Sequence, residues 1–433
     1  MSVHEIQRAH AKLSASGASR WMHCTASAWA ELGFADKGSA FAEEGTRAHA
    51  WAGESLEAGI TAAAWLDRKR LEIELELSAA IRRCDPRHFQ EQSQAAWDKR
   101  DEALETLETL YPHDMHEYVQ DYIDFVHERV RQAKERNTDA VVYIEQRVDF
   151  SPWVPEGFGT GDCVIISDEV LDVTDLKYGK GVFVGVEENV QLMLYALGAW
   201  NMFNHLFDLK RIVLNLYQPR IGNIAQWEIS VEQLLEWAES QVKPTADRVW
   251  YAMETGDLSN VEFDASDYES CQFCKAKIHC RARRDRMVAM TMYEFAEPAM
   301  LSDAEVIACL AEAKHLQKWA ADLETWALEE AGRGKKFAGK KLVEGRANRK
   351  YSDEEAVKTA LVMEGYEPVQ FTKSKLIGVT DMTALLKGKK KFEALLGDFI
   401  TKPRGKPVLV DEADPRPELD DKVKAAEGFE PVE

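Results

Sequence analysis

Gly159–Tyr195 reads GTGDCVIISDEVLDVTDLKYGKGVFVGVEENVQLMLY. After a glycine-rich turn come two short runs rich in Val, Ile and Leu, Cys163–Ile166 and Val170–Leu176, separated by turn-forming residues. Short apolar runs bounded by turn residues are typical of buried strands, so the segment predicts a β-hairpin. The fold and the candidate site are both predicted outward from this hairpin.

Each predicted strand carries an acid that a buried strand does not normally tolerate. Asp162 stands at the start of the first strand, and Asp175 lies near the end of the second. Because a buried carboxylate must be paired or must hold a cation, two converging carboxylates indicate a site. Lys177 follows Asp175 with one residue between them, and this spacing puts both side chains on the same face of a strand.

Helical segments flank the hairpin. Downstream, Gln191 and Tyr195 are four residues apart in a periodic segment and therefore share one face of a helix. Upstream, Phe41–Leu56 has apolar and small residues at helical spacing and contains His49. A single histidine in a helix is more often a surface or core residue than a ligand, so composition alone gives His49 no role.

The motifs of these segments resemble those of the RecB-type branch of the PD-(D/E)xK nucleases: Asp162, Asp175-x-Lys177 and Gln191-x-x-x-Tyr195. Gly45–His49 is similar to the helical G-x-x-x-H motif of that branch. The proline of the family name is absent, since Thr174 precedes Asp175. Phage-encoded members contain a segment very similar to DLKYGKG.

The resemblance implies an α/β, restriction-endonuclease-like (PD-(D/E)xK) core with a mixed sheet, a helical insertion and an α-rich C-terminal appendage. It also implies hydrolysis of DNA with Mg²⁺ or Mn²⁺, hard cations that suit carboxylate oxygens. The implied metal ligands are His49, Asp162, Asp175 and the backbone carbonyl of Leu176. Lys177 would orient or deprotonate the attacking water, and Gln191 and Tyr195 would hold Lys177 or the DNA strand.

The function that the resemblance implies is that of a DNA nuclease, most simply an exonuclease, in phage DNA replication or recombination. Phage relatives suggest a single-strand-binding or annealing protein as partner. The alternative is a catalytically idle DNA-binding or scaffold subunit of a recombination complex. No GxxxxGK[ST] motif occurs in the sequence, so an intrinsic ATP motor is not expected.

A further strand is predicted at Ala140–Phe150 from its β-branched and aromatic residues. Its Glu145 has two equally weighted interpretations. It reaches the metal site, as an acid at this place sometimes does in the wider superfamily, or it is a cross-strand partner of Arg147 or another cation.

Three of the seven cysteines are clustered, as Cys271-x2-Cys274-x5-Cys280. Cytosolic chains do not usually use such spacing for disulfides, so the cluster predicts a metal centre that needs a fourth ligand. Zinc would accept the three thiolates with His279 or a remote ligand. A [4Fe–4S] cluster would take a fourth thiolate, such as Cys24. Spacing alone leaves both possibilities open.

The arrangement of a lone N-terminal cysteine with the downstream cluster resembles the iron–sulfur branch of RecB-like nucleases, as in AddB. That resemblance favours a [4Fe–4S] cluster held by Cys24, Cys271, Cys274 and Cys280, with structural Zn²⁺ as the alternative. The cluster would clamp the two ends of the nuclease domain together. The other three cysteines are interpreted as structural thiols, namely Cys84, Cys163 and Cys309.

The length of 433 residues and the distribution of motifs predict two domains. We expect a nuclease domain over residues 1–290, with a helical lobe at about 60–136. An α-rich domain with an extended acidic tail is expected over residues 291–433.

Bulk properties bear on the partners. No run approaches the roughly 20 apolar residues that cross a bilayer, and the N-terminus has no apolar signal region, so we expect a cytoplasmic protein without a membrane partner. The net charge of −21 argues against indiscriminate nucleic-acid binding. A DNA partner therefore requires a locally basic cleft.

Overall fold

The computed structural model describes residues 11–35, 38–179, 182–289, 303–345, 350–373, 375–376, 382, 385–386, 389–401 and 407–411. The chain divides into two compact units, Met1–Ala289 and Met290–Glu433. The first unit contains every residue predicted for a site.

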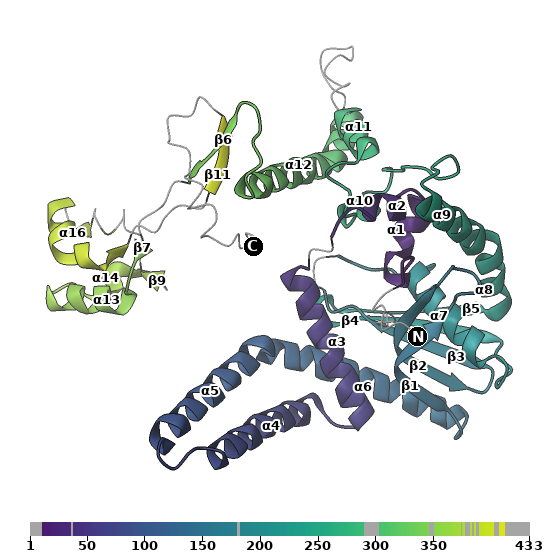
Figure 1. Cartoon of the computed structure of the whole chain (residues 1–433), viewed down its shortest axis with the longest axis horizontal. Helices are drawn as coiled ribbons and strands as arrows, with labels where there is room; N and C mark the ends of the chain where they lie inside the picture. The colour runs from purple at the N-terminus through teal and green to yellow at the C-terminus, as the bar shows by residue number, and fades with distance from the viewer. Residues whose placement is uncertain are drawn as a thin grey trace. The chain divides into compact units, whose positions relative to one another are not determined.

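A five-stranded mixed sheet forms the centre of the first unit (Figure 1). Its strands lie in the order of the sequence: β1 (Val141–Asp149), β2 (Phe158–Ser167), β3 (Val170–Leu176), β4 (Arg211–Gln218) and β5 (Asn223–Ser230). Only β3 and β4 run parallel, and the other neighbours are antiparallel. The prediction of an α/β fold with a mixed sheet is confirmed at this level.

The predicted hairpin is present, and β3 has the predicted bounds Val170–Leu176. The strand before it begins at Phe158, several residues earlier than its apolar run indicated. The reason is pairing, because the glycine-rich residues continue the antiparallel ladder with β1 as far as Phe158 opposite Asp149. Cross-strand hydrogen bonds stabilise this part of β2, whose composition is unlike that of a strand.

Helices cover both faces of the sheet (Figure 1). On one face α7 (Val190–Phe203) is almost wholly buried and packs with Val164 and Ile166 of β2. On the other face α3 (Ala40–Ala58) and α6 (His113–Arg136) pack with the intervening strand residues, including Cys163. The alternation of side chains along β2 thus divides the core into two layers.

The helical segment expected as a lobe divides into two parts. The first, α4 (Ala62–Arg82) and α5 (Phe89–Leu110), forms a two-helix arm that leaves the body of the unit (Figure 1). The second, α6, is separated from α5 by Tyr111 and Pro112 and belongs to the core. Its apolar stripe repeats at helical spacing and is buried against the sheet.

Most of the remaining helices of the first unit come from its two ends. They are η1 (Ala15–Gly17), α1 (Ala18–His23), α2 (Ser27–Glu31), α8 (Val231–Trp237), the π-helical turn η3 (Ala238–Val242), α9 (Lys243–Thr255), α10 (Tyr268–Gln272) and α11 (Arg281–Ala289). The π turn η3 connects α8 directly to α9, so the helical run Val231–Thr255 contains one π turn.

The second unit begins with the long helix α12 (Asp303–Gly332) and has a small apolar core of its own. The other elements are β6 (Lys340–Glu344), β7 (Lys350–Tyr351), α13 (Glu354–Met363), α14 (Pro368–Phe371), β8 (Thr372–Lys373), β9 (Lys375–Leu376), α16 (Lys389–Leu396), η5 (Gly397–Phe399), β10 (Ile400–Thr401) and β11 (Pro407–Asp411). β11 pairs with β6, so this part of the expected extended tail is a strand. The residues after 411 lie outside the described ranges.

No helix in the described part of the chain combines the length and the apolar character that a membrane span needs.

Candidate functional site

Three acids stand in one row across β1, β2 and β3. Between the pairs Ile144–Cys163 and Gln146–Gly161, the β1–β2 register places Glu145 opposite Asp162. The β2–β3 register, continued by one residue from its last pair, places Asp162 opposite Asp175. Because like charges directly opposite each other on a sheet are destabilising, such a row requires compensating cations.

His49 supplies one compensating charge. Its Nδ1 lies 3.3 Å from Oδ1 of Asp162, and Oδ2 of Asp162 accepts a hydrogen bond of 2.6 Å from the backbone N–H of Leu176. Burial favours the neutral imidazole, but the charge and hydrogen bond of Asp162 outweigh it and raise the pKa of His49 to about 9. Burial also disfavours ionised Asp162, yet His49 and the Leu176 N–H hold its pKa below the usual value.

Lys177 supplies a second charge, on the other side of the row. Its Nζ lies 2.7 Å from Oδ2 of Asp175 and donates a 2.8 Å hydrogen bond to Oε1 of Gln191. The amide nitrogen of Gln191 donates to the hydroxyl of Tyr195 at 2.9 Å and, more weakly, to Oδ1 of Asp175 at 3.5 Å. The structure thus brings four of the predicted residues into one connected network.

Backbone features hold this network in place. The backbone N–H of Lys177 donates to the carbonyl of Tyr217 at 2.8 Å and so continues the parallel β3–β4 pairing past the strand end. Asn189 precedes α7 and caps it, because its side chain accepts a hydrogen bond from the backbone N–H of Leu192. A side chain at Gly159 would place its Cβ only 2.6 Å from the ring of Tyr195, so β2 needs glycine there to admit the tyrosine.

Glu145 is held in an unusual conformation. Its φ of 47° lies in the left-handed region, which is uncommon for residues other than glycine. Glu145 is exposed as a whole residue, but partial desolvation of its carboxyl group and the neighbouring Asp162 charge raise its pKa to about 7. A strained backbone and an opposed like charge at one position are typical of a functional site.

The surroundings of Glu145 distinguish a cross-strand ion pair from a place in the metal site. The guanidinium of Arg147 lies over the ring of Phe158, 3.7 Å from its centroid, and not against Glu145. Among the described residues, the one group of three metal-ligating side chains whose donor atoms all lie within 4.8 Å of one another is His49, Glu145 and Asp162. The geometry therefore favours the metal-site interpretation of Glu145. Asp175 is not in that group, and its carboxylate contacts Lys177 and Gln191 instead.

The sequence interpretation missed Gly53, which makes room for Glu145. A Cβ at Gly53 would lie 2.9 Å from Cγ and 3.1 Å from Oε1 of Glu145. Glycine in the interior of a helix destabilises it by about 1 kcal/mol relative to alanine, so a buried glycine in the middle of α3 was a signal for close packing.

We expect Gly53→Ala to lower the affinity for Mn²⁺ by roughly tenfold, because the added methyl group displaces Glu145 while the helix itself becomes more favourable. Isothermal titration would measure the affinity. In a Glu145→Ala background, Gly53→Ala should not lower the affinity for Mn²⁺ any further. Equal losses of affinity in both backgrounds would show that Gly53 does not act through Glu145.

The four predicted cluster cysteines come from the two ends of the first unit. Cys24 follows α1, and its Sγ lies 3.7 Å from the carbonyl of Glu262. The same carbonyl accepts a hydrogen bond from the N–H of Ala26, and the N–H of Glu262 donates to the hydroxyl of Thr25. These contacts fasten the N-terminal segment to the chain that leads into the cysteine cluster.

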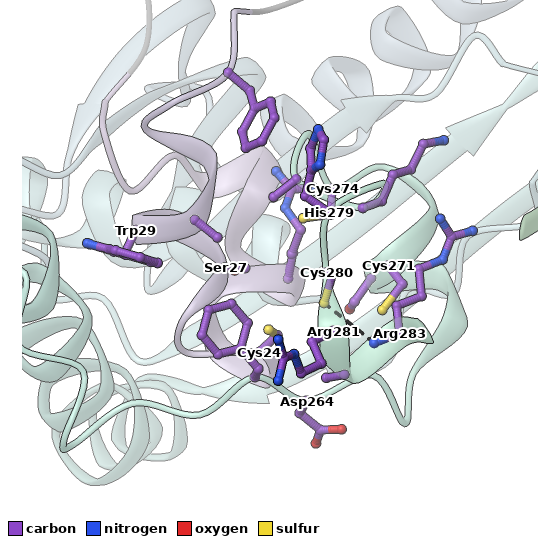
Figure 2. A pocket seen from close by; sticks show the side chains of 18 of the residues that line it. Cys24, Ser27, Trp29, Asp264, Cys271, Cys274, His279, Cys280, Arg281 and Arg283 are labelled. Carbon is purple, nitrogen blue, oxygen red and sulfur yellow. Dashed lines mark hydrogen bonds between the residues drawn. The ribbon is translucent and has the colours of Figure 1, made fainter. Parts of the chain in front are cut away.

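Cys24, Cys271, Cys274 and Cys280 all line one cavity of about 610 Å³ (Figure 2). The six cysteines described are free thiols, and among the described residues no three cysteine sulfurs lie within 4.8 Å of one another. A single zinc ion with Zn–S bonds of about 2.3 Å would hold its thiolates roughly 3.8 Å apart. The sulfurs are therefore spread more widely than a zinc tetrahedron.

Charges around the cavity act on these thiols. Burial raises the pKa of Cys24, raises that of Cys271 to about 11, and raises that of Cys274 to about 12. The positive charge of Arg283 opposes the rise at Cys271, and that of Arg20 opposes it at Cys274. The cavity thus combines buried sulfurs with fixed cations, which suits an anionic group bound by thiolates.

His279, the zinc ligand of the alternative, lines the same cavity, and its ring stacks on Phe34 with centroids 5.4 Å apart. Cys163 is buried in the sheet core, and Cys84 lies on the two-helix arm. Cys309 falls within α12, where its side chain lies outside the described residues.

Comparisons with known proteins place the chain in a family without giving it an activity. A solved structure titled "Crystal structure of SSO0001" is similar at 17% sequence identity and a TM-score of 0.21, covering 51% of this chain and 96% of that one. A family model described as "Protein of unknown function (DUF2800)" matches residues 10–417. The chain therefore belongs to the DUF2800 family.

Proposed function

We propose that the first unit is a metal-dependent DNA nuclease of the RecB-like PD-(D/E)xK type, acting as an exonuclease on phosphodiester bonds. The observation that carries the proposal is the row of Glu145, Asp162 and Asp175 beside Lys177 at the end of β3. His49 and Lys177 offset part of the repulsion among these three acids, and a bound divalent cation would offset the rest. Such an arrangement is typical of a catalytic site rather than of a stabilising core.

The donor set fits a hard divalent cation. Carboxylates of Asp162 and Glu145 with the imidazole of His49 suit Mn²⁺ or Mg²⁺, and Asp175 and the carbonyl of Leu176 would complete the shell from the neighbouring strand. His49 must lose its proton to bind the metal, so binding releases a proton. When bound, the ion would neutralise charge on the phosphate and lower the pKa of a water molecule.

The other residues position the reacting groups. Lys177 would orient the attacking water and offset the negative charge that develops on the phosphate. Gln191 fixes the Lys177 ammonium through its carbonyl oxygen, and its amide group also reaches Tyr195. Since Gln191 and Tyr195 act through Lys177, their loss should reduce activity less than loss of an aspartate.

For the cysteine cavity we propose a [4Fe–4S] cluster held by Cys24, Cys271, Cys274 and Cys280. The wide spread of the sulfurs, the size of the cavity and the nearby arginines support a cluster over a single zinc ion. The role is mechanical, because the ligands come from both ends of the unit and would tie them together.

The test is degradation of end-labelled DNA by the purified chain. We expect linear DNA to be shortened with Mn²⁺ or Mg²⁺ and to be left intact with EDTA, and covalently closed circular DNA to resist. Cleavage of the circular DNA would show that the activity is that of an endonuclease and not of an exonuclease. Binding without cleavage of any substrate would favour the DNA-binding or scaffold role in phage recombination, beside a single-strand-binding or annealing protein.

A further inference from the structure

Arg220 lies immediately beyond the carboxyl end of β4, in the short helix η2 (Pro219–Ile221). Its Nη1 is 3.0 Å from Oε1 of Glu44, and its guanidinium lies over the ring of Tyr178, 4.9 Å from the centroid. The two charged side chains are 10% and 26% exposed, so the pair is partly buried yet reachable from solvent.

The pair is adjacent to the candidate catalytic network. Tyr178 directly follows Lys177, whose backbone is hydrogen-bonded to Tyr217, three residues before Arg220. Glu44 belongs to the same helix, α3, as His49. Arg220 therefore approaches the end of β3 from the β4 side, where it contacts the ring of Tyr178, the residue that directly follows Lys177.

We propose that Arg220 binds a backbone phosphate of the DNA strand next to the phosphate being hydrolysed, and that Glu44 occupies this position when DNA is not bound. This inference rests on the proposed nuclease function. A carboxylate and a phosphate present similar paired oxygens to a guanidinium, so one can replace the other. The Tyr178 ring fixes the plane of the guanidinium in advance, which reduces the entropy lost on binding.

The negative net charge of the chain makes individual cations such as Arg220 important for DNA binding, and pairing with Glu44 would make such a cation selective. With a net charge of −21, long-range attraction contributes little to DNA binding, and affinity must come from individual cations at the site. A glutamate that leaves Arg220 only for a correctly placed phosphate would discriminate against other anions.

A purely structural role makes a different prediction. The Arg220–Glu44 pair also joins α3 to the end of β4, so it would serve as a clasp that holds His49 in position. In that case loss of either partner should impair the protein in the same direction. If Glu44 competes with phosphate, loss of the two partners should have opposite effects on DNA binding.

The experiment measures fluorescence anisotropy of a labelled oligonucleotide in an Asp175→Asn background, over a range of salt concentrations. Arg220→Gln should weaken binding by roughly tenfold and make the slope of log K against log salt shallower by about 0.7 to 0.9, the effect of one lost phosphate contact. Glu44→Gln should tighten binding severalfold.

The control pair is Arg211 and Glu228, which form an exposed 3.0 Å ion pair at the opposite end of β4. Arg211→Gln and Glu228→Gln should leave both affinity and slope unchanged. Weaker binding by Glu44→Gln, or an unchanged slope for Arg220→Gln, would overturn the assignment of Arg220. If the parent protein binds no oligonucleotide at all, both the proposed nuclease function and the assignment of Arg220 are wrong.

Discussion

Asp175→Asn is expected to reduce metal-dependent hydrolysis of DNA by about a thousandfold or more while the fold and the iron content are retained. The change removes a carboxylate that we propose as a metal ligand, and it removes the ion-pair partner of Lys177. Several kcal/mol of charge stabilisation at the metal corresponds to such a factor. Single-turnover cleavage of labelled DNA would measure the loss.

The same variant, Asp175→Asn, should not lose stability when it loses activity. Burial raises the pKa of Asp175, and although Lys177 opposes this rise, the Asp162 charge adds to it. Ionised Asp175 is thus held at a cost, and the neutral amide should leave the free energy of unfolding unchanged or slightly increased.

Asp172 provides a matched control in the same strand. It is buried and accepts hydrogen bonds from Arg129 and, at 2.7 Å, from Asn215. Asp172→Asn should lower the free energy of unfolding by on the order of 3 kcal/mol, since Arg129 loses its buried partner, while turnover per folded molecule is kept. Full activity of Asp175→Asn, or equal loss of activity in both variants, would exclude the proposed site.

Cys274→Ser has the second large expected effect. The protein should be colourless, contain little iron and lose roughly 2–5 kcal/mol of stability, comparable with loss of a covalent cross-link over a long loop. The reason is the sequence distance between Cys24 and the other three cysteines, which a cluster would bridge. Visible absorption, iron analysis and thermal unfolding together measure the effect.

Cys84→Ser is the control for that variant. Cys84 lies in the two-helix arm. Within the described residues, its sulfur makes one hydrogen bond, to the carbonyl of Ala80 at 3.5 Å. Its loss should change neither spectrum nor stability. A Cys274→Ser protein with wild-type iron content and spectrum would reject the cluster.

The central fold was predictable because its signals are local. Val170–Leu176 is a continuous apolar run between turn residues, and its bounds were predicted correctly. The start of β2 was not, since its glycines acquire strand structure only by pairing with β1. The π turn η3 could not be predicted either, because apolar periodicity does not show where a helical turn holds one extra residue.

The site was predictable where chemistry depends on spacing along one strand, as for Asp175 and Lys177. His49 required a motif, because a lone histidine in a helix carries no signal of its own. The roles of Glu145 and Gly53 could be recognised only in the three-dimensional structure. The left-handed φ of Glu145 and its contact with α3 arise from segments about ninety residues apart in sequence, which no local pattern encodes. Arg220 was missed for the same reason.

The most direct test of a cation among the acids is an anomalous difference map from crystals soaked in Mn²⁺. The account predicts a peak within ligand distance of His49 and Asp162, with Glu145 or Asp175 as a further ligand. The absence of a peak at this place, with His49 still paired to Asp162 at saturating Mn²⁺, would contradict the proposed metal-dependent nuclease.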